Sequence, residues 1–430
     1  MTVDWSAFAR PTPPWFLDAK LGIFIHWGPY SVPAWAEPTG ELGAVDEHVW
    51  FRHNPYAEWY ANTIRFEDSP ARAHQRDVYG DAPYDDFLDS WSAERFDADS
   101  WAGLFARIGA RYVVPTTKHH DGIALWDAPG TGLRNTVRRG PRRDLVHELA
   151  EATRRHGMRF GVYYSGGLDW GVTDLPRIDT SAAVRGVRPN DAAYAAYVYG
   201  HVRDLVDRHR PDVLWNDIEW PDSGKHDGSL GLAELFRHYY ASVPDGLVND
   251  RFGATHQDFG TSEYQAHRES ESSAAWEHCR GIGLSFGYNR VEDARHLLSG
   301  DELVRQFVDV VSRGGNLLLN VGPTAAGEIP AGQLAVLEHL GAWLAGAGDA
   351  IYGTRALPDG RATPSDDPWI RWTTRDGRAF AIVDATGPVV LPARADAFEL
   401  RDGQRADGGI AVELPAGPGP AVVSFELRRP

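Results

Sequence analysis

The chain has 430 residues and a net charge of −17, with 43% hydrophobic and 24% charged residues. This balance is typical of folded globular proteins and excludes a wholly disordered chain. The negative charge argues against nucleic acid and anionic membranes as partners, because both require a basic protein surface. The single cysteine, Cys279, excludes an internal disulfide framework and a cysteine-based zinc site.

The sequence contains no apolar run long enough to span a membrane, which takes about 18 residues or more. Residues 1–16 lack the apolar core of a secretory signal. We therefore expect a cytoplasmic protein that does not insert into membranes. The sequence leaves assembly into a homo-oligomer open.

Nearly continuous apolar runs predict the strands of a parallel sheet that is buried on both faces. These runs are Leu21–Trp27, Arg111–Thr116, Arg159–Ser165, Asp212–Asp217, Gly246–Asp250, Ile282–Gly287 and Asn316–Val321. Helical patterns lie between them, at Ser100–Ala110, at Arg143–His156, from a cap at Asn190 to Pro211, and from a Ser299–Glu302 capping box to Gly314. This alternation predicts an α/β fold, and the length fits a (β/α)8-like barrel in which one strand is hidden or the barrel is imperfect.

The pattern changes after Tyr352. Residues 355–430 have no helical period, and the segment Trp369–Thr373 alternates in the manner of a strand. Hairpin turns are predicted at Asp376-Gly377, Asp402-Gly403 and Asp407-Gly408. We therefore expect a barrel domain at residues 1–352, a small antiparallel β-sandwich domain at residues 353–430, and a linker around residues 350–362.

Polar and aromatic residues recur where the predicted strands end, which is where a parallel barrel carries its chemistry. They include His26, Lys118–Gly122, Tyr163–Ser165, Trp215–Asp217, Asn249–Arg251, Ser262–Tyr264 and Trp276-Glu277. No serine nucleophile elbow, phosphate-binding loop or dinucleotide fingerprint accompanies them. Polar side chains take the hydroxyls of a sugar while an indole face packs on its ring, and two carboxylates can cleave a glycosidic bond. The residues alone therefore favour a glycosidase.

Longer motifs carry a resemblance to a known family. They are GIFIHWGPYSVPAW (22–35), NPYAEWY (54–60), PTTKHHDG (115–122), GVYYSGGLDW (161–170), LWNDIEWP (214–221), VNDRFG (248–253), SEY (262–264), WEHCRGIGLSFGYN (276–289) and GGNLLLNVGP (314–323). Together they resemble glycoside hydrolase family twenty-nine, the α-L-fucosidases, over about residues 15–352. The resemblance implies a (β/α)8-like barrel followed by a β-sandwich, with α-L-fucosides as substrates.

The resemblance also implies a role for each matching residue. Asp217 matches the catalytic nucleophile, and Glu263 matches the acid/base of a retaining double displacement, whose carboxyl groups lie roughly 5–5.5 Å apart. The sugar-binding positions fall on His26, Glu58, Trp59, His119, His120, Tyr164, Trp215 and Arg251. Neither a cofactor nor a metal is implied.

Several alternatives stand beside these assignments. Glu277 and Glu58 are the other candidates for the acid/base. Glu219 stands where related sequences often have glycine, so it adds a carboxylate that is either solvated or raises the pKa of a neighbour as a like charge. Cys279 is expected to be a small buried hydrophobic residue.

Two further classes of function compete with a fucosidase. His26, His119 and His120 could support a metal-dependent hydrolase, although adjacent residues at a strand end point to opposite sides, which argues against a shared metal. A catalytically inactive sugar-binding protein is the other class, and the presence of both Asp217 and Glu263 argues against it.

The chain contains 16 tryptophans, as many as its tyrosines. Trp101 and Trp343 fall on helical patterns and are expected in the core. We interpret eight others as a lining of the sugar site, with Trp59 and Trp215 nearest the sugar. These eight are Trp27, Trp35, Trp59, Trp126, Trp170, Trp215, Trp220 and Trp276.

Overall fold

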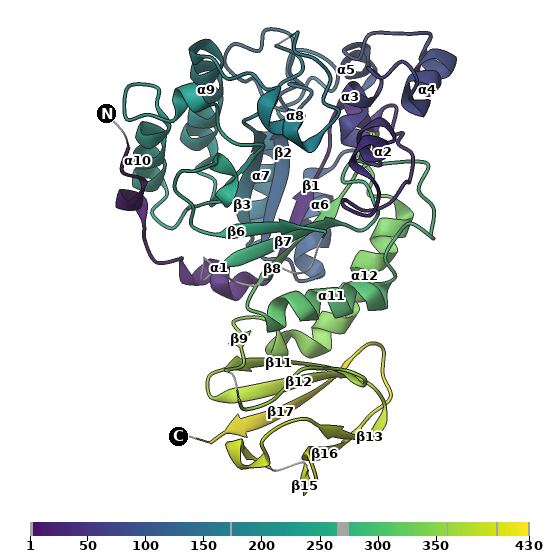
Figure 1. Cartoon of the computed structure of the whole chain (residues 1–430), viewed down its shortest axis with the longest axis vertical. Helices are drawn as coiled ribbons and strands as arrows, with labels where there is room; N and C mark the ends of the chain where they lie inside the picture. Colours follow the sequence, from purple (N-terminus) through teal and green to yellow (C-terminus); the bar gives the residue numbers. More distant parts are fainter. Residues whose placement is uncertain (1–2, 173, 265–274, 359, 401–402, 429–430) are drawn as a thin grey trace.

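The computed structural model describes residues 3–172, 174–264, 275–358, 360–400 and 403–428. Its centre is a parallel sheet with the strand order β5-β4-β3-β2-β1-β8-β7-β6, curled into a barrel (Figure 1). The strands are β1 (Leu21–Ile25), β2 (Tyr112–Lys118), β3 (Arg159–Ser165), β4 (Val213–Asp217), β5 (Leu247–Val248), β6 (Gly260–Glu263), β7 (Trp276–Gly281) and β8 (Asn316–Val321).

The barrel is closed weakly between β5 and β6. These two strands are not neighbours in the sheet, and a single parallel bridge between Asn249 and Phe259 joins them. Side chains supplement it, because Asp250 accepts hydrogen bonds from both the backbone N–H and the hydroxyl of Thr261, at 3.0 and 2.7 Å. The seam between β5 and β6 is therefore held largely by polar side chains.

The strand predicted at Ile282–Gly287 is wrong, and two strands of the barrel were not predicted: β7, which ends at Gly281 directly before that segment, and β6. Ile282–Gly287 is an irregular segment that follows β7. Its N–H groups turn to side chains instead of a neighbouring strand, as when Gly287 donates to Glu58 at 2.7 Å. The sequence pattern does not predict β6 because this strand is only four residues long and only its first residue is buried, so it contains no apolar run.

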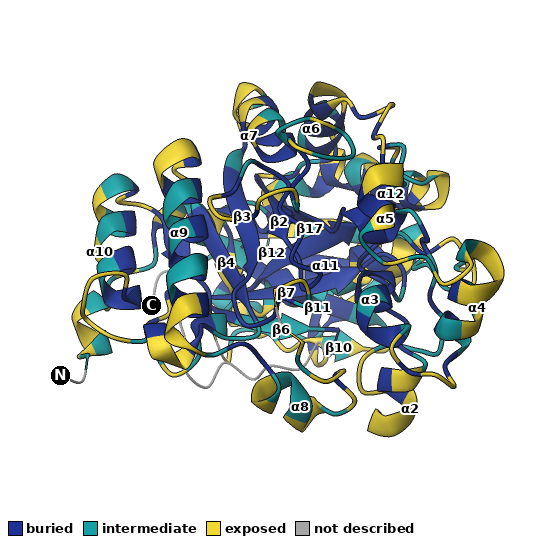
Figure 2. Cartoon of the chain, turned by 90° about the horizontal axis from the view of Figure 1, so that it is seen from above, coloured by how far each residue is buried: buried dark blue, intermediate teal, exposed yellow. Residues whose placement is uncertain are grey.

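Helices cover the outside of the barrel, with exposed faces turned away from the buried strands (Figure 2). The longer ones are α6 (Ala98–Arg107), α7 (Leu145–Arg155), α9 (Ala192–His209), α10 (Leu232–Ser242), α11 (Gly300–Ser312) and α12 (Ala331–Ala347). The excursion between β1 and β2 adds α2 (Glu47–Arg52), α3 (Tyr60–Thr63), α4 (Pro70–Tyr79) and α5 (Asp86–Ser90), while α1 (Pro14–Ala19) precedes β1 and α8 (Ser181–Gly186) precedes α9. Within the described part of the chain, no helix is long and apolar enough to cross a membrane.

Two of the predicted helix starts have clear outcomes. Ser299 and Glu302 form the expected capping box, in which each side chain accepts a hydrogen bond from the other residue's backbone N–H. The cap of α9 is Asp191 and not Asn190, because the Asp191 carboxylate accepts from the N–H of Tyr194. Asn190 instead donates its side-chain amide to Asp222 at 2.8 Å.

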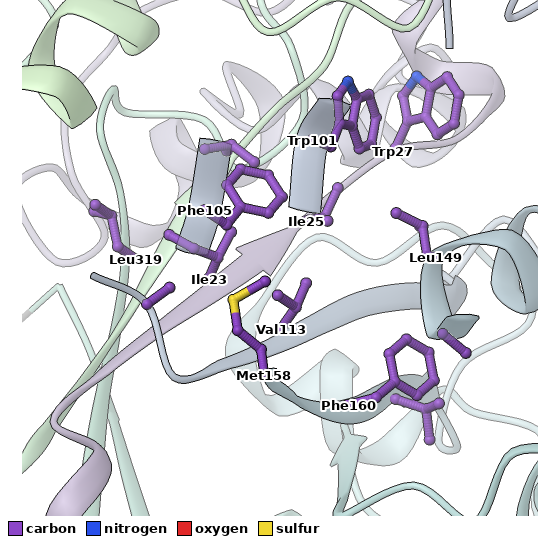
Figure 3. Close-up of a cluster of buried hydrophobic side chains, with 14 of the residues drawn as sticks. Ile23, Ile25, Trp27, Trp101, Phe105, Val113, Leu149, Met158, Phe160 and Leu319 are labelled. Carbon is purple, nitrogen blue, oxygen red and sulfur yellow. The ribbon is translucent and has the colours of Figure 1, made fainter. Parts of the chain in front are cut away.

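Strand alternation divides the interior into two cores. Residues such as Ile23, Ile25 and Val113 point outward and pack under the helices, whereas Phe24 and Trp215 point into the barrel. Figure 3 shows part of the outer layer, in which Phe105 and Leu149 from the helices meet the strand residues. Successive side chains on a strand therefore alternate between the barrel interior and the helix layer, and a residue near the carboxyl end of a strand faces the cavity only at every second position.

This alternation corrects the interpretation of the tryptophans. Trp27 points outward and lies beside Trp101 (Figure 3). Its ring centroid is 4.9 Å from that of Trp91 and 5.0 Å from that of Trp101. Trp126 and Trp220 are also fully buried in this layer. The expectation that Trp101 and Trp343 are core residues is confirmed. Much of the tryptophan excess thus stabilises the contact between strands and helices.

Beyond the barrel, two antiparallel sheets pack into a sandwich below α11 and α12 (Figure 1). One contains β9 (Arg355–Ala356), β10 (Ser365–Asp366), β11 (Trp369–Arg375), β12 (Arg378–Asp384), β14 (Phe398–Glu399) and β17 (Ala421–Leu427), and the other β13 (Gly387–Leu391), β15 (Gln404–Ala406) and β16 (Gly409–Leu414). The predicted turns at Asp376-Gly377 and Asp407-Gly408 are confirmed. Asp402 of the third turn lies outside the described residues. The predicted (β/α)8-like barrel followed by a β-sandwich is therefore confirmed.

The capping box of α11 allows a test of stability. Replacing Ser299 by alanine removes the acceptor for the Glu302 N–H, which should lower the free energy of unfolding by about 1 kcal/mol. Urea denaturation followed by circular dichroism would measure the change. S299D, which keeps an acceptor, should recover most of it; equal stability of S299A and the parent protein would contradict the assignment.

Candidate active site

A cavity of about 230 Å³ opens at the carboxyl ends of the barrel strands. Seven of the eight predicted sugar-binding residues line it, together with Asp217 and Glu263. The seven are His26, Glu58, Trp59, His119, His120, Trp215 and Arg251. The volume lies below the roughly 300–1,000 Å³ of sites for drug-sized ligands, so it suits one sugar ring with the rest of the substrate outside.

The guanidinium of Arg251 joins the two candidate catalytic carboxylates. One terminal nitrogen lies 2.9 Å from Oδ1 of Asp217, and the other lies 3.0 Å from Oε2 of Glu263. Its Nε donates to Thr261 at 3.1 Å, and its plane lies over the ring of Trp215, 4.6 Å from the ring centroid. Asp217 ends β4, Arg251 follows β5 and Glu263 ends β6, so this contact crosses the seam of the barrel.

The surroundings of Asp217 favour its ionised form. Burial alone would raise the pKa of this carboxyl, but the charge of Arg251, with hydrogen bonds from Arg251 and Tyr163, outweighs that effect and lowers the pKa below its usual value. The hydroxyl of Tyr163 donates to Oδ2 at 2.8 Å, and the N–H of Ile218 donates to Oδ1 at 2.9 Å. Asp217 is therefore a buried, fixed carboxylate at neutral pH.

Glu263 is held by two donors from different parts of the chain. Besides Arg251 at Oε2, the hydroxyl of Tyr56 donates to Oε1 at 3.1 Å. The Tyr56 ring stacks near Tyr264, with centroids 6.1 Å apart. Glu263 is more exposed than Asp217, with 18% of its side chain accessible against 10%. It therefore lies closer to the opening of the cavity.

The three histidines of the site are neutral at physiological pH. Burial lowers the pKa of His26 to about 4 and that of His120 to about 3, and it lowers the pKa of His119 well below the usual value. Nδ1 of His26 pairs with Oδ1 of Asn320 at 2.7 Å, and Nδ1 of His120 pairs with Oγ of Ser165 at 2.7 Å. Neutral imidazoles both donate and accept, which suits sugar hydroxyls.

His119 and His120 do not point to opposite sides, contrary to expectation. Their ring centroids are 4.0 Å apart and both residues line the cavity. The pairing of β2 with β3 shifts register between Thr116 and Lys118, and β2 ends at Lys118, so the two histidines lie beyond regular strand geometry. Among the described residues, no group of three or more histidine, cysteine, aspartate or glutamate side chains is arranged to hold a metal ion.

Glu58 and Glu277, the alternative acid/base candidates, occupy different places. Glu58 lines the cavity, accepts from the N–H of Gly287, and has its pKa raised to about 7 by burial. Glu277 does not line the cavity; its oxygens accept from the Tyr112 hydroxyl and, at 2.9 Å, from the Trp215 indole N–H. Burial raises the pKa of Glu277 to about 7 as well, so it is a structural support beneath Trp215.

Tyr164, which is predicted to bind the sugar, does not line the cavity, whereas its neighbour Tyr163 does. Tyr164 points outward, where its hydroxyl bonds Nδ1 of His201 at 2.9 Å and Lys118 lies over its ring. Tyr163 pairs in register with Trp215, stacks near it and contacts Asp217. The alternation of side chains along the strands predicts this. Asp217 and Trp215 are two residues apart on β4, so they face the same side, and Tyr163 is the β3 residue paired with Trp215, so it faces that side too.

Glu219 is kept away from the cavity. Its backbone lies in the left-handed region, with φ of 74°, which explains physically why glycine suits this position. Its carboxylate pairs with Arg188 at 2.8 Å and lies 3.6 Å from Lys225. Glu219 is thus compensated by its own cations and does not contact Asp217.

The predicted tryptophan lining is reduced to two of its eight members, Trp59 and Trp215. Trp50, which was not predicted, joins them. Trp170 packs behind the wall, with its ring centroid 5.4 Å from that of Trp59. Phe24 and Phe286 supply further apolar lining, and Cys279 is buried there, as expected for a small hydrophobic residue.

Comparison with known proteins places this geometry in a family. A family model described as Alpha-L-fucosidase matches residues 2–349. The chain belongs to the alpha-L-fucosidase family. It is therefore a glycoside hydrolase, as its motifs indicated.

Members of the alpha-L-fucosidase family resemble this chain over most of their length. The Dictyostelium discoideum alpha-L-fucosidase is 32% identical over 386 residues, which are 87% of this chain and 78% of that protein. The human tissue alpha-L-fucosidase is 34% identical over 362 residues, 82% of this chain and 72% of that protein. A Thermotoga maritima alpha-fucosidase solved in complex with fucose is 43% identical, with a TM-score of 0.88 over 98% of this chain and 99% of that one.

The Arg251 contact predicts a change in pH dependence. Replacing Arg251 by glutamine removes the charge that lowers the pKa of Asp217, so burial should raise that pKa, by roughly one to three units. Asp217 is the predicted nucleophile, and a nucleophilic carboxyl acts only in its ionised form, so the acidic limb of kcat/KM for p-nitrophenyl α-L-fucoside should move to higher pH. R95Q, which removes an exposed pair with Glu328, serves as the control and should leave the limb in place. An unshifted limb in R251Q would contradict the argument.

Proposed function

We propose that this protein is a retaining exo-glycosidase that removes terminal α-L-fucosyl residues by double displacement. The observation that carries the proposal is the pair of carboxylates, Asp217 and Glu263, joined by Arg251 at a cavity sized for one sugar. Family membership and the fucose complex of the Thermotoga maritima relative support α-L-fucose as the sugar.

In the first step, Asp217 attacks the anomeric carbon while the bond to the leaving oxygen breaks. Its lowered pKa supplies the carboxylate, and its place at the end of β4 keeps the attacking oxygen near the required position. Glu263 in its acid form gives its proton to the leaving oxygen. A fucosyl ester on Asp217 and a free aglycone result.

In the second step, Glu263 as a carboxylate takes a proton from water, and the water oxygen attacks the anomeric carbon. The ester bond breaks, and Asp217 leaves as a carboxylate beside Arg251. Two inversions at the same carbon give net retention. Proton NMR of early product should therefore show α-L-fucose before mutarotation, and β-L-fucose as the first product would overturn the mechanism.

The remaining cavity residues are proposed to bind the sugar. The neutral histidines His26, His119 and His120 face the hydroxyls, and Nδ1 of His119 has no hydrogen-bond partner among the described residues. Phe24 and Phe286 provide the apolar wall that the methyl group of fucose requires. Trp59 and Trp215 add aromatic faces, and Glu58 adds a carboxyl for a hydroxyl donor.

The proposed nucleophile is tested by its removal. D217G should fold and lose activity on p-nitrophenyl α-L-fucoside, on the order of 10⁴-fold. Azide enters the space of the missing carboxylate, so it should restore part of the activity and yield β-L-fucosyl azide, identified by NMR. Undiminished hydrolysis by D217G, or a rescued product of α configuration, would contradict the assignment.

The proposed acid/base is tested by the leaving group. E263A should lose roughly 10²- to 10⁴-fold on fucosyl disaccharides, whose leaving oxygen needs a proton, and much less on aryl fucosides with acidic phenols. E277Q serves as the control, because Glu277 lies outside the cavity, and any loss it causes should be similar for both substrate types. Equal losses of E263A on both substrates would point to another carboxyl.

A further inference from the structure

The opening of the cavity is built from two segments that lie far apart in the sequence. Among the lining residues, Leu42, Ser181 and Arg185 are exposed, so they mark where the cavity meets solvent. Leu42 precedes α2, while Ser181 and Arg185 lie on α8. An exo-acting enzyme binds the terminal sugar inside, so the next unit of the substrate lies against these residues.

This rim is a fixed part of the structure. The hydroxyl of Thr180 accepts from the N–H of Ala183 at 3.1 Å and caps α8. The N–H of Ser181 donates to the carboxylate of Glu47 on α2, which ties the two segments together. Ala183 and Val184 pack against the inner hydrophobic core.

Arg185 stands out on this rim because it has no ion-pair partner among the described residues. The arginines around it are engaged: Arg188 pairs with Glu219 and Asp222, while Arg177 lies over the ring of Phe66. The backbone carbonyl of Arg185 accepts a hydrogen bond from Nε of Arg188 at 3.0 Å, which does not involve the Arg185 guanidinium.

Trp50 provides a second unsatisfied donor at the same opening. Its side chain is buried, and its indole N–H has no hydrogen-bond partner among the described residues. Its ring packs 5.1 Å from that of Tyr56, which contacts Glu263. Since Glu263 is the proposed proton donor to the leaving oxygen, Trp50 lies on the leaving-group side of the cavity.

We propose that this rim selects fucosides whose leaving group carries an acidic function, a carboxylate or a sulfate ester, with Arg185 as the determinant. The planar fork of a guanidinium matches the geometry of such oxyanions. The Trp50 N–H would bind an oxygen acceptor of the same unit, and Leu42 and Val184 cover its apolar face. This inference rests on the proposed fucosidase activity.

Matched aryl fucosides test it. The meta-carboxyphenyl and meta-carbamoylphenyl α-L-fucosides differ in charge at similar shape. A meta-sulfophenyl and meta-sulfamoylphenyl pair replaces the carboxylate by an –SO3− group, the anionic end that a sulfate ester also presents. For each substrate, kcat/KM is measured for the parent protein, R185Q, R185K and the control R107Q, an exposed arginine on α6 outside the cavity. The ratio of kcat/KM for the acidic substrate to that for its neutral partner is calculated for each protein. Because the same two phenols leave in every variant, a change in this ratio does not come from their different acidities.

The acidic member should lose about threefold to fivefold in R185Q relative to its neutral partner, as expected of a solvent-exposed ion pair. R185K should lose less, R107Q should lose nothing, and salt at 0.5 M should erase the effect. An unchanged acidic-to-neutral ratio in R185Q for both pairs overturns the inference. Hydrolysis of none of the fucosides by the parent protein would instead overturn the proposed function, so the two failures are distinguishable.

Discussion

The site depends on one cation, Arg251, placed between a buried carboxyl group, Asp217, and a half-buried one, Glu263. Two carboxylates in a shared cavity repel each other, and one of them would take up a proton if nothing compensated the charge. Arg251 contacts both with separate nitrogens, and its third donor position binds Thr261. A lysine has a single charged nitrogen and no planar fork, so it could not contact these three acceptors in the same way while lying over the ring of Trp215.

Arg251 is held by the ring of Trp215 as well as by its hydrogen bonds to Asp217, Glu263 and Thr261. Trp215 presents one face to the guanidinium, and its indole N–H is fixed by the buried Glu277. Glu277 is in turn held by Tyr112 on β2. Glu277, which the sequence offered as an alternative acid/base, thus fixes the Trp215 ring over which Arg251 lies.

Much of the fold and the site could be predicted from the sequence, because parallel barrels place chemistry at strand ends and buried strands are apolar. Asp217 and His26 fall at such ends and line the cavity as expected. Closeness to a strand end does not show which side of the sheet a residue faces. Tyr164 and Trp27 lie at strand ends but point outward, and Tyr163 faces the cavity instead of Tyr164. The short strand β6 was invisible because a half-exposed, polar strand has no hydrophobic signature.

Other features depend on contacts that no local pattern encodes. The register shift in β2 brings His119 and His120 to the same cavity. Tyr56 and Trp50 come from the long excursion between β1 and β2. Tertiary packing places Tyr56 against Glu263 and Trp50 against Tyr56. The pairing of distant segments, and not residue type, decides these parts of the site.

The weak seam of the barrel has a consequence for how the catalytic distance is maintained. The proposed nucleophile lies on β4 and the proposed proton donor on β6, on opposite sides of a joint with one backbone bridge. In a fully laddered sheet, the spacing of two such groups is dictated by the main chain. Here the spacing also depends on the side-chain contacts of Asp250, Arg251 and Thr261, so a substitution at one of them can change the distance between the two carboxyl groups while the strands stay in place.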